Sequence, residues 1–267
     1  MSSHIDVLGT TALTILVVMV ATWLISLAMR DAGIVDIVWG AGFVIAGWAA
    51  YLTGDGHDTR SDLLIAMVSI WGLRLAFYLA RRNLGKAEDW RYQLMRRKHG
   101  DKFAIRSLLT VFGLQGVLMW VVSLPVQLAM TPADPAVGWI AVVGVIVWGV
   151  GLFFETVGDA QLTRFKADPD NVGQVLDDGL WRYTRHPNYF GDFCVWWGIF
   201  LVAAETGDAL FGIIGPIVMT VLLTRVSGVP MLEHSMAKRR PGYVEYVERT
   251  SAFFPRAPKP AADKPTS

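Results

Sequence analysis

Long apolar runs recur along the chain and limit what it can fold into. A helix needs about 20 apolar residues to cross roughly 30 Å of hydrocarbon. Runs that approach this length lie at residues 7–29, 34–52, 63–80, 107–130, 137–157, 189–204 and 210–226. The mean hydropathy of +0.41 and the 53% share of hydrophobic residues exceed those of a soluble domain. The sequence therefore predicts an all-α, polytopic membrane protein with about seven transmembrane helices.

The same runs predict the organisation of the chain. Residues 1–255 are expected to form one membrane domain, and residues 256–267, rich in Pro, Ala and Lys, a disordered cytoplasmic tail. The first run is interpreted as a retained helix, because no basic stretch precedes it and its apolar part is too long for a signal peptide. Cys194 is the single cysteine, which excludes an intrachain disulfide and a cysteine-based metal site. No metal is expected.

Lysine and arginine are unevenly distributed over the connections between the runs. Twenty-two of the 24 basic residues fall on one side, Arg60 falls on the other, and Arg74 lies within the third run. Because basic connections mark the cytoplasmic side, we expect a multi-pass protein of the cell inner (plasma) membrane. Its amino terminus lies outside and its carboxyl terminus in the cytoplasm in this prediction. The two halves of the chain do not mirror each other, which disfavours a transporter.

The densest polar stretch is the run 180–192, at the start of the sixth apolar run. It contains Tyr183, Arg185, His186, Asn188 and Asp192. An ionised group near the bilayer centre costs at least roughly 2.5–3.5 kcal/mol, so such a crowd indicates a polar, anionic ligand. The alternative is a capped helix entry with arginines that reach toward the interface.

Three other clusters lie on the same side. Glu155 and Asp159 are four residues apart and share a helix face, where they either accept hydrogen bonds from ribose hydroxyls or pair with arginines. The run 81–92 carries arginines and Asn83, which match phosphate oxygens, although the positive-inside rule alone also places basic residues there. The run 225–246 is either an interfacial helix with aromatic anchors or the lid of the same anion site.

A family resemblance rests on these stretches. The run Gly-Leu-Trp-x-Tyr-x-Arg-His-Pro-Asn-Tyr-x-Gly-Asp at 179–192, the segment 225–246 and the Phe-Phe-Pro at 253–255 resemble the steroid 5-alpha-reductase superfamily. The chain is most similar to the bacterial branch of that family, long described as a domain of unknown function. The likeness is strong over residues 150–255, fair at 81–92, and based on hydropathy over the first two runs. It implies seven helices, NADPH bound from the cytoplasm, and hydride delivery to a carbon–carbon double bond of a lipid.

The clusters and the resemblance together assign the cofactor site to the part of the chain around residues 150–255 and to the run 81–92. A basic excess suits a 2′-phosphate and favours NADPH over NADH. Glu155 departs from the asparagine that the family carries there. The expected cofactor-binding residues are Asn83, Glu155, Asp159, Lys166, Tyr183, Arg185, His186, Asn188, Asp192, Arg225, Glu233 and Tyr246.

The resemblance also implies a carboxylate-supported tyrosine that polarises the substrate carbonyl. Asp36 is the acid with the closest placement, and Tyr78, four residues after Arg74, is the tyrosine assigned with it as catalytic. The Gln-Glu pair of the family is not reproduced around Asp36. The alternative is that Asp36 caps the second helix and pairs with Arg74.

The main rival is methyl transfer. Isoprenylcysteine and phospholipid methyltransferases share an Arg-His-Pro-x-Tyr-x-Gly motif and a later glutamate, here Glu233 with Tyr243 and Tyr246, and bind S-adenosylmethionine. Asn188, Asp192 and two additional spans favour the reductase. A non-enzymatic membrane scaffold ranks third. The expected partners are the bilayer and a lipid substrate (a steroid enone, an unsaturated acyl chain or an isoprenoid), with no nucleic acid and no obligate protein.

Overall fold

The computed structural model describes residues 3–55, 58–131, 137–226, 233, 236, 240 and 242–259, and every regular element in these ranges is a helix. The chain forms two compact units: unit 1 comprises Met1–Gly144 and Ile199–Val218, and unit 2 comprises Val145–Gly198 and Met219–Ser267. The α-helices are α1 (His4–Met29), α2 (Ile34–Thr53), α3 (Thr59–Asn83), α4 (Trp90–His99), α5 (Phe103–Ser107), α6 (Leu114–Val122), α7 (Leu124–Leu128), α8 (Trp139–Ala167), α9 (Pro187–Ala203), α10 (Ile214–Val221) and α12 (Tyr243–Arg249). Short 3₁₀ or π-helical stretches include Leu108–Gly113, Gly179–Arg182 (η4), Gly207–Ile213 (η5) and Leu222–Val226.

The prediction of an all-α polytopic membrane protein is confirmed. Within the described residues, six segments are long and apolar enough to cross a membrane: His4–Met29, Ile34–Thr53, Thr59–Asn83, Trp90–Val122, Trp139–Ala167 and Gly207–Val226. The run expected at 189–204 is helical as α9, whose 17 residues lie at the short end of the range of about 17–25 for a span. Of the expected tail, residues 260–267 lie outside the described residues.

Local side-chain bonds determine where two of the long helices of unit 1 begin. Ser3 and Asp6 form a capping box before α1, with Ser3 N donating to Asp6 Oδ2 at 2.8 Å. Asp58 and Ser61 form another before α3, with Ser61 N donating to Asp58 Oδ1 at 2.7 Å. Each box satisfies backbone N–H groups that a helix end leaves unpaired. The polar residues between the apolar runs therefore define these boundaries.

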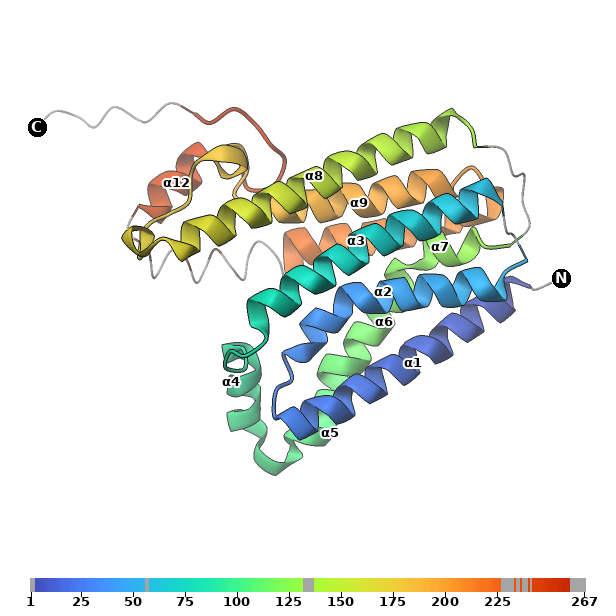
Figure 1. Ribbon diagram of the computed structural model, residues 1–267, viewed down its shortest axis with the longest axis horizontal. Helices are drawn as coiled ribbons and strands as arrows, with labels where there is room; N and C mark the ends of the chain where they lie inside the picture. The colour runs from blue at the N-terminus through green and yellow to red at the C-terminus, as the bar shows by residue number, and fades with distance from the viewer. Residues whose placement is uncertain are drawn as a thin grey trace, which may run out of the picture. The chain divides into compact units, whose positions relative to one another are not determined.

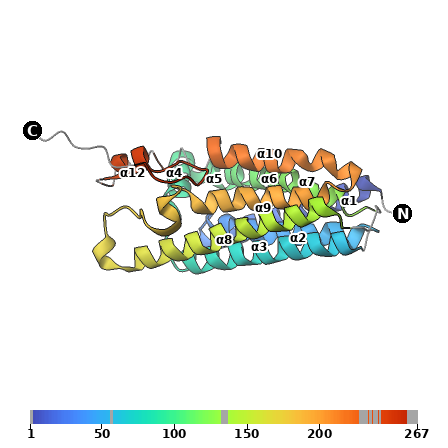
Figure 2. The same ribbon diagram turned by 90° about the horizontal axis from the view of Figure 1, so that it is seen from above.

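Helices α1, α2 and α3 of unit 1 lie side by side in Figures 1 and 2, and α2 and α3 approach at backbone distance. A Cβ added to Gly40 would lie 2.5 Å from the Gly72 carbonyl oxygen, and one added to Gly72 would lie 2.6 Å from that of Gly40. Only glycine fits such a crossing, which is typical of packing between membrane helices. The fully buried Trp71 and Phe43 pack edge to face nearby, with centroids 5.6 Å apart.

One carboxylate of unit 1 holds several elements together. Glu205 accepts hydrogen bonds from the backbone N–H groups of Gly138 (2.8 Å) and Ala141 (3.2 Å) and from Arg60 Nη2 (3.1 Å). Burial favours the neutral acid, but these donors outweigh it and hold the pKa of Glu205 below its usual value. The side chains of Arg60 and Glu205 are 2% and 11% exposed. A buried ion pair thus joins the start of α3, the start of α8 and the turn after α9.

Unit 2 contains a second close crossing of the same kind. A Cβ on Gly151 of α8 would lie 2.5 Å from the Gly191 carbonyl oxygen of α9, and one on Gly191 would lie 2.6 Å from that of Gly151. Phe190 and Phe193 on α9 pack edge to face against Phe253, with centroids 6.3 and 5.7 Å away. The C-terminal segment is therefore packed onto the first half of α9.

Candidate functional site

Arg185 is the centre of a buried polar knot in unit 2. Its Nε donates to Glu233 Oε1 at 2.7 Å, and its Nη1 donates to the carbonyl oxygens of Val247 (3.0 Å) and Thr250 (2.5 Å). Its backbone N–H donates to the Ser251 carbonyl at 2.9 Å. The side chain is 8% exposed, so the charge is balanced by these partners rather than by water. Arg185 therefore connects the entry to α9 with α12 and the segment after it.

Glu233 also contacts the neighbouring histidine. His186 Nε2 lies 3.2 Å from Glu233 Oε1, and the His186 ring stacks on Tyr189 with centroids 5.4 Å apart and planes at 8°. Burial tends to raise the pKa of Glu233, but the bonds from His186 and Arg185 outweigh it and hold the pKa below its usual value. Glu233 is thus an ionised carboxylate that accepts from Arg185 and contacts the His186 ring.

The stretch before α9 is held in place by bonds that reach across unit 2. Gly179 has a φ of +55°, a conformation that favours glycine, and the next N–H, of Leu180, donates to Gln161 Oε1 at 3.0 Å. Trp181 Nε1 donates to the Gly158 carbonyl of α8 at 3.1 Å, and Tyr246 OH donates to the Trp181 carbonyl. Burial raises the pKa of Tyr246, which keeps this phenol a donor.

Both predicted carboxylates of α8 are buried, and Glu155 lies at the α8–α9 contact. Glu155 and Asp159 are 3% and 4% exposed. A Cβ on Gly191 would lie 2.7 Å from Glu155 Cγ, so the Glu155 side chain crosses this glycine of α9. Asn188 accepts a hydrogen bond from Tyr189 N at 3.1 Å, and Asp192 is half-buried one turn further along α9. The contact therefore brings Glu155 to the polar first turns of α9.

The other expected cofactor residues occupy different surroundings. Lys166, Tyr183 and Arg225 are exposed on unit 2, and the Tyr183 carbonyl accepts a hydrogen bond from Arg256 N at 3.0 Å. Asn83 lies at the end of α3 in unit 1, where it accepts from Arg82 Nε at 3.0 Å. These positions leave their cofactor roles as predictions.

The two residues expected to be catalytic lie in unit 1. Asp36, in the first turn of α2, accepts from Tyr92 OH at 3.0 Å and from Arg91 Nη2 at 3.2 Å. Tyr78 lies on α3 beneath two guanidinium groups, with Arg74 Cζ 5.5 Å and Arg82 Cζ 5.6 Å from its ring centroid. The structure therefore brings Asp36 together with Tyr92, whose only sequence signal is its place in the basic run 81–92.

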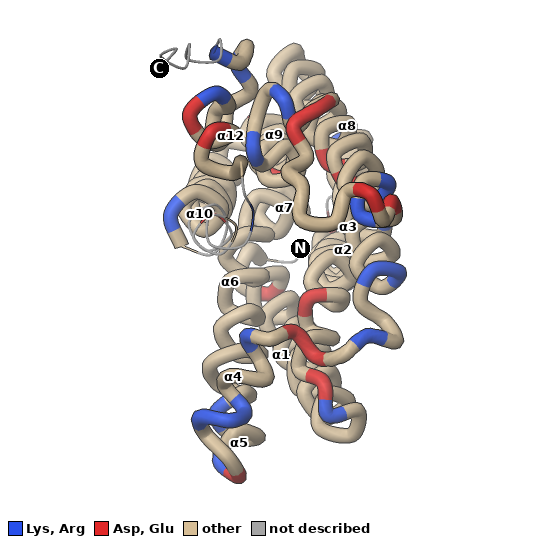
Figure 3. The backbone as a smooth tube through the Cα atoms, turned by 90° about the vertical axis from the view of Figure 1, so that its left-hand side faces the viewer, with Lys and Arg blue, Asp and Glu red and all other residues tan. Residues whose placement is uncertain are grey.

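Glu88, two residues before α4, connects this helix, which carries Tyr92, to the turn between α1 and α2 through hydrogen bonds. Glu88 Oε1 accepts from Arg96 Nη2 at 2.8 Å and from the backbone N–H of Ala32 at 2.9 Å. Figure 3 colours the basic positions of α4 blue, and its last turn holds Arg96, Arg97 and Lys98. Asp36 and Glu88 each accept a hydrogen bond from a donor 56 positions away. Such contacts have no local sequence signal, because helical spacing reports only contacts within one element.

Among the described residues, no group of three or more His, Cys, Asp or Glu side chains is placed to hold a metal ion. The described polar groups offer cations and carboxylates instead. In unit 2, arginines and lysines match phosphate oxygens, and the buried α8 carboxylates match hydroxyl donors. The donor set therefore fits a phosphorylated, hydroxyl-bearing cofactor.

The helices and this polar knot define a polytopic α-helical membrane protein. The chain belongs to the family described as "Protein of unknown function (DUF1295)", whose model matches residues 22–250. An uncharacterized protein of Schizosaccharomyces pombe (strain 972 / ATCC 24843) is 28% identical over 102 residues, which cover 35% of this chain and 27% of that protein. The chain thus matches well under half of the length of this relative. No solved structure matches the chain.

Proposed function

We propose that this protein is an integral membrane NADPH-dependent oxidoreductase of the steroid 5-alpha-reductase superfamily that reduces a carbon–carbon double bond of a lipid. The observation that carries the proposal is the Asp36–Tyr92 pair of unit 1, a buried phenol 3.0 Å from a carboxylate at the end of a membrane-length helix. The resemblance implies a carboxylate-supported tyrosine for carbonyl polarisation, and this pair has that chemistry. Methyl transfer has no need of such a pair.

The residues of unit 1 receive the following roles in this proposal. Tyr92 has one hydroxyl proton, which it donates to Asp36 until a conjugated substrate binds; it then donates to the substrate carbonyl oxygen and stabilises the negative charge that develops there. Asp36 orients the phenol, and Arg91, 3.2 Å from Asp36, balances the carboxylate. Tyr78 keeps its role from the sequence analysis as the second candidate tyrosine.

The residues of unit 2 hold the cofactor in this proposal. A reduced nicotinamide supplies the hydride when NADPH is bound. Glu155 and Asp159 would accept hydrogen bonds from ribose hydroxyls, and Asn188 and Asp192 would hold the nicotinamide half. Arg185, His186 and Glu233 shape the site by holding α12 against the start of α9, since the Arg185 bonds are already used within the protein. The remaining residues assigned from the sequence keep their roles as proposed contacts.

The basic connections support an orientation for the proposed enzyme. We place the amino terminus outside and the carboxyl terminus in the cytoplasm of the plasma membrane, because 22 of the 24 basic residues fall on the expected inner side. Cytoplasmic NADPH then reaches unit 2 from water, while a steroid enone, an unsaturated acyl chain or an isoprenoid reaches the helices from the lipid.

One observation favours the methyltransferase as the second candidate. Glu233 contacts Arg185 and His186, and Tyr243 and Tyr246 lie close by with ring centroids 5.9 Å apart. The resemblance to the methyltransferases rests on these same residues. The two functions therefore use the same knot and differ in the cofactor that binds to unit 2.

Ligand-induced stabilisation tests the proposal. The purified protein in detergent is heated with NADPH, NADH or S-adenosylmethionine, and NADPH is expected to raise Tm the most, because a ligand that binds only the folded state stabilises it. Oxidation of NADPH is then followed with a steroid enone, an unsaturated acyl lipid and a polyprenyl lipid. Stabilisation by S-adenosylmethionine alone would overturn the reductase, and a response to none of the three would favour a scaffold.

A further inference from the structure

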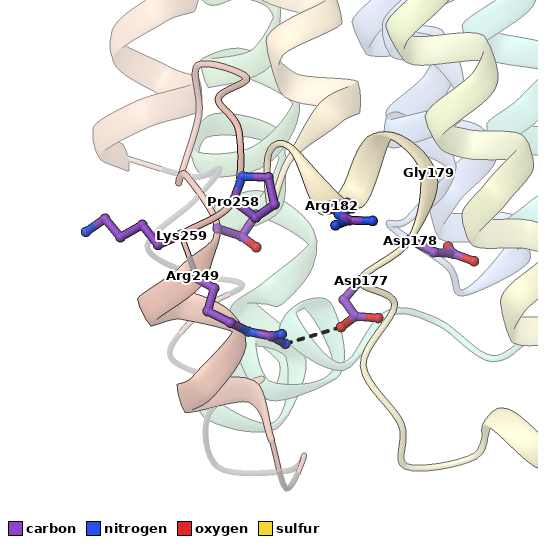
Figure 4. A pocket seen from close by; sticks show the side chains of 8 residues that line it. Asp177, Asp178, Gly179, Arg182, Arg249, Pro258 and Lys259 are labelled. Carbon is purple, nitrogen blue, oxygen red and sulfur yellow. Dashed lines mark hydrogen bonds and ion pairs between the residues drawn. The ribbon is translucent and has the colours of Figure 1, made fainter. Parts of the chain in front are cut away.

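An open cleft of about 570 Å³ lies on the surface of unit 2, next to the buried knot. One wall carries Asp177, Asp178 and Arg182, and the other carries Arg249, Pro258 and Lys259. Figure 4 shows these side chains, with Arg249 directed toward Asp177. The volume is sufficient for a nucleoside phosphate, because small-molecule pockets typically measure about 300–1,000 Å³.

The two walls are joined by bonds between distant parts of the chain. Arg249 Nη2 lies 3.3 Å from Asp177 Oδ2, and Lys259 N donates to the Arg249 carbonyl at 3.0 Å. Tyr246 OH donates to the Trp181 carbonyl, directly beside Arg182. These bonds hold the two walls together, so ordering them adds little to the cost of binding.

The charges in the cleft favour an anion. Its lining holds three cations and two carboxylates, and the pairing of Arg249 with Asp177 already balances one of each. Arg182 is exposed, and its backbone follows directly after Leu180 and Trp181, which are held by hydrogen bonds to Gln161 and to the Gly158 carbonyl. A guanidinium binds a phosphate monoester through two parallel N–H donors. Figure 4 shows the Lys259 side chain extending away from Arg182 and Asp177, so Arg182 is the cation best placed for a ligand, and Asp178 adds an acceptor for an amine or hydroxyl.

We infer that this cleft binds the phosphorylated adenosine end of the dinucleotide and that Arg182 distinguishes NADPH from NADH by binding the 2′-phosphate. The inference rests on the proposed function and extends it to residues outside the buried knot. Pro258 offers an apolar surface to the adenine ring, and Asp178 offers an acceptor to its amino group. The preference for NADPH over NADH thus depends on the exposed Arg182, whereas the buried Arg185 stabilises the packing of unit 2.

The inference is tested on the full-length protein by titration calorimetry. The ligands are adenosine 2′,5′-bisphosphate and adenosine 5′-monophosphate, followed by NADPH and NADH. Arg182→Ala is expected to weaken the binding of the bisphosphate and of NADPH about 10- to 100-fold, the effect of losing charged hydrogen bonds. The monophosphate and NADH should change little. Arg164→Ala, at an exposed position of α8, is the matched control, and Lys259→Ala should show a smaller loss than Arg182→Ala.

The outcomes separate this inference from the function on which it rests. Failure of the wild type to bind either dinucleotide would overturn the proposed function and the inference with it. Equal losses for NADPH and NADH in Arg182→Ala, with unchanged Tm, would overturn the inference alone. Vesicles rich in phosphatidic acid form the last arm: Arg182-dependent binding to them, without any effect on the bisphosphate, would assign the cleft to a lipid headgroup instead.

Discussion

Arg60 donates to Glu205 at 3.1 Å in a buried pair that joins three elements of unit 1. Replacement of Arg60 by alanine removes the charged hydrogen bond to Glu205, which keeps its two backbone donors, and we expect a loss of about 1.5–3 kcal/mol in the free energy of unfolding. Lys98→Ala, at an exposed position of α4, is the control and should change stability by less than about 0.5 kcal/mol. Thermal unfolding in detergent measures both. A small effect of Arg60→Ala would show that water or lipid headgroups replace the guanidinium.

The lowered pKa of Glu205 predicts a pH dependence of stability. A carboxyl whose folded pKa lies below its unfolded value of about 4.3 stabilises the fold above that value and loses this contribution as the pH falls through the folded pKa. Glu205→Gln should therefore flatten the decline of Tm below about pH 4.5 and lower Tm at neutral pH. Identical slopes for the two proteins in a pH series would contradict this assignment.

The α8–α9 crossing predicts a contrast between two neighbouring glycines. An added Cβ on Gly151 meets the Gly191 carbonyl oxygen at 2.5 Å, whereas one on Gly149 meets nothing within 4 Å. Gly151→Ala should cost about 1–3 kcal/mol through overpacking. Gly149→Ala should be neutral or slightly stabilising, because alanine loses less backbone freedom than glycine. Equal Tm values for the two variants would argue against the close crossing.

Arg185 predicts a defect confined to unit 2. Arg185→Lys keeps the charge but cannot reach Glu233 and the Val247 and Thr250 carbonyls at once, and each lost charged hydrogen bond costs about 1.5–3 kcal/mol. Hydrogen exchange should then accelerate in residues 243–250 and remain unchanged in α2 and α3. Arg164→Lys is the control. A uniform acceleration across the chain would show global unfolding instead.

The Asp36–Tyr92 pair predicts a catalytic defect without a binding defect. Removal of a positioned acid typically lowers the rate about 10²- to 10⁴-fold, so Tyr92→Phe should reduce the kcat of NADPH oxidation by that range. The affinity for NADPH should not change. Tyr78→Phe is measured in parallel: full turnover in this variant removes Tyr78 from the mechanism, and full turnover in Tyr92→Phe removes Tyr92.

Apolar length allowed most of the fold to be predicted, because one property of about 20 consecutive residues decides whether a helix can span. The site residues were harder to predict from the sequence. Tyr78 was selected through its spacing of four from Arg74 on one helix, whereas Tyr92 reaches Asp36 from 56 positions along the chain. Arg185 was recognised as part of a polar run, but its partners Glu233, Val247 and Thr250 lie 48, 62 and 65 positions away. Tertiary packing alone brings such groups together.

The large sequence separation between Arg185 and its partners also has a consequence for biosynthesis. Its carbonyl partners at Val247 and Thr250 are made more than sixty residues later, after α9 and α10. Chain synthesis proceeds at about 5–20 residues per second, so Arg185 waits several seconds at least for its partners. During that interval its charge lacks the acceptors that balance it in the finished protein. The nascent chain therefore depends on water, lipid headgroups or a chaperone to shield this arginine until the last helix arrives.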